Sequence, residues 1–227
     1  GAFICLGLAL LGWLVADGVT RFRALNRSVE VKGLSEREVP ADIAIWPITF
    51  READNDLSSL YSTIQRKNAA VIEFLARRGF EPGELFTAAP AVVDKQAQEY
   101  SGQETSRYRY AASSTITVYT GKVELVRDSM QQLVELGKVG IAIVGDTYES
   151  RTQFVFTGLN EIKPPMIEEA TRNASEVAEK FAQHSHSRLG KIKRAAQGQF
   201  SVEDRDSNTP YIKKVRVVST VEYFLAD

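Results

Sequence analysis

The sequence predicts an α+β domain, in which helices pack on one face of a largely antiparallel sheet, preceded by one N-terminal transmembrane helix. Two observations predict this fold. Apolar residues with the period of strands alternate along the chain with apolar residues at helical spacing, and no low-complexity linker interrupts them. The first residues, by contrast, are almost entirely apolar and carry no charged side chain up to Ala16.

The N-terminal apolar stretch, residues 2–16, is predicted to be an uncleaved membrane anchor, with residues 1–19 forming the transmembrane segment. A full span needs about 20 apolar residues. Because the chain begins with Gly1 rather than Met, we expect further residues to precede it and to lengthen the span. A cleaved export signal is the alternative, since Ala16 and Gly18 satisfy a small-residue cleavage rule.

A juxtamembrane linker is predicted over residues 20–28, followed by one folded region over residues 29–227. The linker contains Arg21, Arg23 and Arg27. Basic residues at the end of a span favour the cytoplasmic side, which would place the folded region in the cytoplasm. The competing residues on the other side of the span are missing, so the charge pattern alone leaves the topology open.

The first half of the folded region predicts four strands and one long helix. The helix is predicted over residues 57–75, with Asp54 or Asp56 as its N-cap and Gly79 at its end. Pro47 lacks an amide hydrogen and therefore predicts an edge position or a bulge in its strand. The strands are predicted over residues 29–32, 41–50, 85–93 and 108–119, with a hairpin loop over residues 95–106.

The second half predicts two further helices. The shorter one covers residues 123–136 and is ended by Gly137. Pro164 and Pro165 are predicted to open the longer one, because the first turn of a helix does not need the amide hydrogen that proline lacks; Gly190 follows its end. The inner face of this helix is predicted to consist of Ile167, Ala170, Ala174, Val177, Ala178 and Phe181. Extended segments are predicted over residues 141–144, 152–156, 191–201 and 212–225.

The order of elements and several short motifs resemble the SIMPL domain family, over essentially everything that follows the anchor. The motifs are residues 29–33 (Val-Glu-Val-Lys-Gly), residues 40–44 (Pro-Ala-Asp-Ile-Ala), the helix over residues 170–182, residues 189–192 (Leu-Gly-Lys-Ile) and the strand over residues 215–225. The resemblance implies an exported, often periplasmic domain associated with envelope or oxidative-stress tolerance, and large homo-oligomers in some members. It supplies no catalytic residues. The retained anchor departs from members with a cleavable signal and favours a surface-tethered protein.

No residue pattern specifies a catalytic, cofactor-binding or metal site, so the sequence predicts none of them. His184 and His186 are the only histidines, and at this spacing they do not share a helix face. Glu36, Glu38 and Asp42 are interpreted as solvated residues at a turn and a strand entry. No nucleophile motif or phosphate-binding glycine pattern is present.

Composition argues against nucleic acid as a partner. The chain has 28 basic and 29 acidic residues, a net charge of −1. Tyr108 and Tyr110 beside Arg107 and Arg109 are interpreted as a strand face rather than as a stacking surface for bases. The single cysteine, Cys5, lies in the anchor, so the folded region has no disulfide and no cysteine-based metal site.

Two functions from different classes are consistent with the sequence. The first is a non-enzymatic domain that is held at the bacterial inner membrane by a single span, faces the periplasm and assembles into a homo-oligomer larger than a dimer, as a scaffold or cage with a link to oxidative or envelope stress. The periplasmic side and the stress link rest on the SIMPL resemblance. The second is a small-molecule-binding or hydrolytic envelope domain whose pocket residues are dispersed along the chain.

Overall fold

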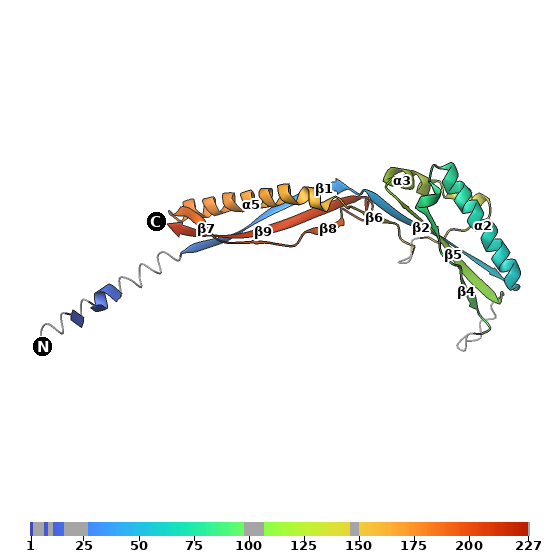
Figure 1. Cartoon of the computed structure of the whole chain (residues 1–227), viewed down its shortest axis with the longest axis horizontal. Helices are drawn as coiled ribbons and strands as arrows, with labels where there is room; N and C mark the ends of the chain where they lie inside the picture. The colour runs from blue at the N-terminus through green and yellow to red at the C-terminus, as the bar shows by residue number, and fades with distance from the viewer. Residues whose placement is uncertain (2–6, 9–10, 16–26, 98–106, 146–149, 227) are drawn as a thin grey trace. The chain divides into compact units, whose positions relative to one another are not determined.

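The computed structural model describes residues 1, 7–8, 11–15, 27–97, 107–145 and 150–226 (Figure 1). Its contacts divide the chain into two compact units. The terminal unit comprises Gly1–Val39, Gly158–Arg205 and Lys214–Asp227, and the central unit comprises Pro40–Thr157 and Asp206–Lys213. Each unit has its own sheet and its own cluster of buried apolar side chains, whereas the sequence pattern predicted one sheet.

The predicted anchor is described only in part. Residues 7–8 and 11–15 are helical, and the side chains of Leu8, Leu11 and Trp13 are exposed. Within the part of the chain that the structure describes, no helix is long and apolar enough to cross a membrane. The other residues of the predicted span, and residues 20–26 of the predicted linker, lie outside the described residues.

The sheet of the terminal unit is built from segments at both ends of the folded region (Figure 1). Its strand order is β1-β9-β7, and β8 also pairs with β9. β7 and β9 are antiparallel, from Arg188 opposite Ala226 to Gln197 opposite Ser219. The strands are β1 (Ser28–Pro40), β7 (Arg188–Gln197), β8 (Ser201–Asp204) and β9 (Ile212–Ala226).

The helix α5 (Leu159–His184) packs on the inner face of this sheet through small side chains. A Cβ atom placed on Gly33 of β1 would lie 1.9 Å from the carbonyl oxygen of Ala170 and 2.5 Å from the amide nitrogen of Ala174. Glycine at position 33 therefore allows the backbones of β1 and α5 to approach this closely. The buried residues of α5 repeat every fourth position: Met166, Ala170, Ala174, Ala178 and Ala182.

This stripe corrects the predicted inner face. Ala170, Ala174 and Ala178 are buried as predicted, but the side chains of Val177 and Phe181 are exposed, Phe181 by 58%. The close approach at Gly33 leaves room only for small side chains along the contact line. Larger apolar residues at neighbouring helix positions point away from it.

The ends of α5 also differ from the prediction. The helix begins at Leu159, so Pro164 and Pro165 lie in its second turn rather than opening it. Without amide hydrogens, the two prolines cannot donate to the carbonyl groups one turn earlier. The helix ends at His184, before Gly190, and the residue that adopts a left-handed conformation after it is His186, with φ 54°.

The sheet of the central unit has the strand order β3-β5-β2-β6, with β4 also paired to β5. β2 and β5 are antiparallel, in a ladder that runs from Ala44 opposite Thr120 to Asp54 opposite Tyr110. The strands are β2 (Ile43–Asp54), β3 (Leu85–Thr87), β4 (Ala91–Asp94), β5 (Tyr110–Thr120) and β6 (Gln153–Val155).

One face of the central sheet is covered by helices (Figure 1). Trp46, Ile48 and Phe50 of β2 are buried together with Ile116 and Val118 of β5. The helical elements are α2 (Leu57–Arg77), α3 (Val123–Gln131), α4 (Val134–Lys138) and the 3-10 helix η1 (Pro82–Glu84). The α+β class and the antiparallel pairing that the sequence predicts are therefore confirmed.

Local signals for the central unit are largely confirmed. The side chain of Asp56 accepts a hydrogen bond from the amide of Ser59 and caps α2, and Gly79 follows the helix with φ 96°. Gly137, predicted to end a single helix, lies inside α4, and Gly140 has the positive φ. Pro47 lies opposite Thr117, on a stretch of β2 beyond the residues that pair with β6.

Candidate interaction surface

The acidic residues noted in the sequence have separate partners. The carboxylate of Glu36 binds Lys214 at 2.5 Å, and that of Glu38 binds Arg205 at 3.3 Å. Both acids lie on the face of the terminal sheet opposite α5, and Asp42 belongs to the central unit. Among the described residues, no group of His, Cys, Asp or Glu side chains could hold a metal ion.

Asp42 joins two segments of the central unit. Its carboxylate accepts hydrogen bonds from the amide of Thr157, at 2.9 and 3.0 Å, and from the Thr157 hydroxyl at 2.8 Å. Its own amide donates to the carbonyl of Val155 at 2.9 Å, and the amide of Ala41 donates to that of Tyr211 at 2.8 Å. The Pro-Ala-Asp-Ile-Ala motif therefore holds the start of β2 in place.

The basic and aromatic residues at the start of β5 contact one another rather than forming an open stripe. The guanidinium groups of Arg107 and Arg109 lie 5.6 and 4.9 Å from the ring centres of Tyr108 and Tyr110. Arg109 also binds Asp94 at 2.9 Å, and this contact lowers the pKa of the Asp94 carboxyl. His184 and His186 are exposed at the end of α5.

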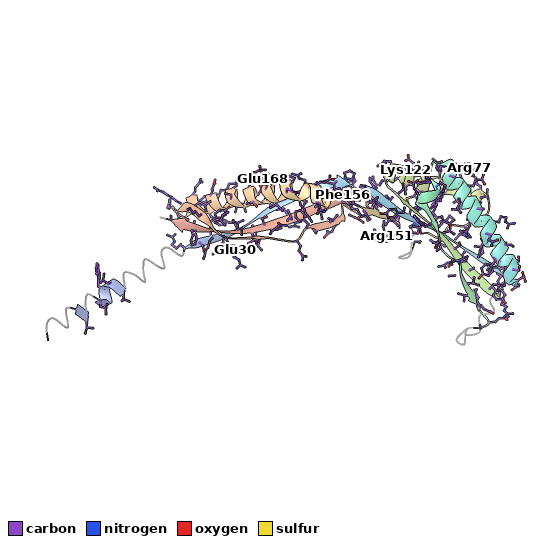
Figure 2. The ribbon with its side chains drawn as sticks, viewed as in Figure 1. Glu30, Arg77, Lys122, Arg151, Phe156 and Glu168 are labelled. Atoms are coloured by element: carbon purple, nitrogen blue, oxygen red, sulfur yellow. The ribbon has the colours of Figure 1, made fainter. Side chains whose placement is uncertain are left out.

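A groove of about 410 Å³ lies at the start of α3 and is lined by Ala41, Lys122, Leu125 and Tyr211, among others. The Lys122 ammonium, labelled in Figure 2, binds Glu81 at 3.1 Å and Glu84 at 3.0 Å. Burial alone would raise the pKa of Glu84, but hydrogen bonds from the Glu81 amide, Thr120 and Lys122 outweigh it and lower this pKa. The charges beside the groove are therefore paired with one another.

The uncovered face of the central sheet has a different character. Register places the odd-numbered side chains of β2 and β5 together on it; for example, Pro47 is opposite Thr117 and Ile45 is opposite Tyr119. We call this surface the open face. It comprises the odd-numbered residues 43–53 and 111–119, together with Phe86, Ala91, Val93, Gln153 and Val155 from the neighbouring strands.

The open face is apolar and hydroxyl-rich, and Arg51 is the one charged residue of this set. Phe86 is 57% exposed and Tyr119 is 49% exposed, and both flank Thr117 in the sheet register. The hydroxyl groups of Thr49 and Thr115 bind each other across β2 and β5 at 2.8 Å. A contiguous surface of this composition is typical of sites of protein association.

The outer face of the terminal sheet contrasts with the open face. It carries ion pairs that join β9 to β7 and to β1, including Glu222 with Lys193 at 2.9 Å, and Arg205, which follows β8, pairs with Glu38 of β1. Hydrogen bonds from Ser28 and Lys193 lower the pKa of Glu222. Charged side chains of this kind stay hydrated, and they oppose association of sheets face to face.

The chain therefore folds into two different α+β units, and the central one presents a sheet face to solvent whose one charged residue is Arg51. The chain belongs to the SIMPL family, described as a protein of unknown function (DUF541), which matches residues 29–223. This match confirms the resemblance seen in the sequence and spans both units. No curated protein matches the chain.

The open face was not predicted from the sequence. A signal was present, because the outward positions of residues 111–119 read Ala-Ser-Thr-Thr-Tyr, without a charge. Outward positions of a solvated strand are usually polar or charged. The signal becomes meaningful only when the register aligns these positions with the outward residues of β2, of which Arg51 alone is charged.

Proposed function

We propose that this protein is a non-enzymatic scaffold of the bacterial cell envelope, which is anchored in the inner membrane and assembles with copies of itself through the open face. The observation that carries the proposal is the nearly uncharged open face, with Phe86 and Tyr119 about half exposed. In a pairing of two copies about a two-fold axis, apolar and hydroxyl groups would meet their equivalents. Arg51 is the one charge of the face that such a pairing has to accommodate.

The size of the open face supports this role. Strands rise by about 3.3 Å per residue and lie about 4.8 Å apart, so the paired strands offer roughly 500 Å² of projected surface. Side-chain relief increases the accessible area toward the roughly 800 Å² that each partner contributes to a standard interface. The face is therefore large enough for a specific contact, provided that most of it is buried.

Assembly beyond a dimer needs a second contact, because a two-fold pairing of one face closes on itself. The N-terminal segments supply it, with Gly12 and Ala16 allowing close approach of helices in the bilayer. A membrane tether also confines the copies to a plane and raises their effective concentration. The family resemblance favours the periplasmic side and a role in envelope or oxidative stress, although Arg21, Arg23 and Arg27 favour the opposite topology.

Mass photometry of the full chain in mild detergent tests the proposal. We expect a species larger than two 25.2-kDa chains plus the micelle. The double variant Phe86→Lys/Tyr119→Lys should reduce the assembly, because each lysine is hydrated in the free chain and would be buried in the interface.

The matched control replaces two exposed apolar residues of the same unit that lie outside the open face, Ile72→Lys in α2 and Val134→Lys in α4. This double variant should assemble like the wild type. A monodisperse mass near one chain plus its micelle across concentrations would contradict self-assembly. An unchanged mass of the Phe86→Lys/Tyr119→Lys variant would show that assembly uses another surface.

A further inference from the structure

The second half of the terminal unit contains a stretch of the chain with a strong local excess of positive charge. Residues 180–202 include both histidines and no Asp or Glu, although the whole chain has a net charge of −1. Their Lys and Arg residues are Lys180, Arg188, Lys191, Lys193 and Arg194. Charge is therefore segregated within this chain rather than spread evenly.

The structure places this stretch at the end of the terminal unit where the chain comes from the N-terminal segment. The amide of Leu225 donates to the carbonyl of Arg27 at 2.9 Å, and the Arg27 guanidinium donates to the Ser187 hydroxyl at 3.2 Å. Arg188 lies opposite Ala226 in the sheet. The last turn of α5, the first residues of β7 and the entry to β1 thus meet at one end of this unit.

Part of this charge is balanced locally and part is not. Lys193 binds Glu222, and Arg194 lies opposite Glu222 in the register and beside Glu30. Lys180, Arg188 and Lys191 are exposed and form no ion pair with the described residues. These three side chains are therefore available to an anionic partner.

Exposed apolar groups lie among these charges. Phe181 is 58% exposed and follows Lys180, and Ile192 is 51% exposed between Lys191 and Lys193. At 100° per residue, Phe181 and Val177 lie 40° apart on one flank of α5 and Glu179 lies on the other. Lys180 lies between the flanks, opposite the buried stripe and one turn from Glu176. Basic side chains interleaved with exposed apolar ones are typical of segments that lie at a membrane surface.

We propose that this end of the terminal unit, formed by Lys180, Phe181, Arg188, Lys191 and Ile192, binds the headgroups of anionic phospholipids in the membrane that holds the anchor. The inference rests on the anchoring part of the proposed function. The 12 residues 16–27 span at most about 40 Å when fully extended, so the tether keeps this end close to the bilayer. Each Lys or Arg near an anionic bilayer contributes about 1 kcal/mol, or about a fivefold change in occupancy of the docked state.

The test uses the full chain with Cys5→Ser, labelled with a fluorophore at Gln183→Cys in the last turn of α5, in lipid nanodiscs. One set of discs contains phosphatidylcholine alone, and the other an equimolar mixture of phosphatidylcholine and phosphatidylglycerol. Both contain nitroxide-labelled lipid, which quenches nearby fluorophores. We expect quenching in the anionic discs that is lost at high salt, since the screening length falls from about 8 Å at 0.15 M to about 3 Å at 1 M.

The triple variant Lys180→Gln/Arg188→Gln/Lys191→Gln should lose this quenching, by about fivefold for each residue. The matched control, Arg66→Gln/Arg77→Gln/Lys138→Gln, removes three exposed basic residues of the central unit and should retain it. These variants change exposed side chains and leave both cores intact.

Co-elution of the protein with the discs is measured separately and reports whether the N-terminal segment is anchored in the bilayer. Co-elution with both kinds of disc but equal quenching in each, insensitive to salt, would overturn the lipid contact and leave the anchor in place. Shielding of the label from aqueous iodide without quenching by lipid would indicate that this surface binds a second copy of the chain, and would also overturn the lipid contact. Co-elution with anionic discs alone, reversed by salt, would support the lipid contact and contradict the anchor; co-elution with neither would contradict both.

Discussion

Gly33→Ala is the substitution whose cost follows most directly from the geometry. The added Cβ would lie 1.9 Å from the Ala170 carbonyl oxygen, whereas real Cβ atoms essentially never approach closer than 3.0 Å. The atoms that it meets are backbone atoms of α5, so no side-chain rotation relieves the contact. β1 and α5 must therefore separate by more than 1 Å, the difference between these two distances.

The separation loosens the buried alanine stripe of α5. A gap of about 0.5–1 Å already removes a quarter to a half of the dispersion energy of a contact. Overpacking typically costs about 1–3 kcal/mol, and rigid backbone on both sides places Gly33→Ala at the upper end. Alanine recovers about 0.5–1 kcal/mol through its lower entropy in the unfolded chain. The expected net loss is about 2 kcal/mol.

Thermal unfolding of the full chain in detergent, followed by circular dichroism, measures this loss. For a chain of this size, about 2 kcal/mol corresponds to a decrease in Tm of roughly 4–8 °C. Gly83→Ala is the matched control, because a Cβ atom at position 83 has no atom within 4 Å. It should leave the Tm unchanged or raise it slightly. A Gly33→Ala variant with the same Tm as Gly83→Ala would refute the close approach of β1 and α5.

Two further predictions concern polar contacts. In the central unit, Asp42→Ala should lower the free energy of unfolding by about 1–2 kcal/mol, measured by denaturant titration with the fluorescence of the buried Trp46 as the signal. In a double-mutant cycle with Thr157→Val, losses of unfolding free energy that simply add would contradict the contact between the two side chains. In the terminal unit, hydrogen bonds from Ser35 and Arg37 lower the pKa of Glu169, so its stabilising contribution is present above the ordinary value of 4.5 and is lost as the pH falls through the lowered pKa. As the pH is lowered, the free energy of unfolding of the wild type should therefore fall more steeply than that of Glu169→Gln. The control Glu168→Gln, at an exposed residue labelled in Figure 2, should behave like the wild type. Equal slopes of unfolding free energy against pH for all three would contradict the lowered pKa of Glu169.

Local patterns in the sequence determined the elements themselves. Residues 57–75 keep helical spacing between a capping aspartate and Gly79, and α2 forms there with the predicted Asp56 cap. Strand periodicity placed β2 and β5 within a few residues of their observed bounds. Three short motifs, together with the helix over residues 170–182, the strand over residues 215–225 and the order of elements, were enough to predict the family. Two of these motifs contain residues at tertiary contacts: Gly33 against α5 and Asp42 at the start of β2.

Only the tertiary structure decided how these elements combine. Helical periodicity cannot tell which apolar stripe of α5 is buried, and the alanine stripe replaced the one with Val177 and Phe181 because Gly33 brings the two backbones into contact. The periodicity of strands likewise cannot divide them between two sheets. β1 pairs with β9, and these two strands lie at opposite ends of the folded region. The open face exists because pairing between distant segments aligns the mostly uncharged outward positions of β2 and β5. Pairing of this kind depends on contacts far apart in the sequence, which no local pattern records.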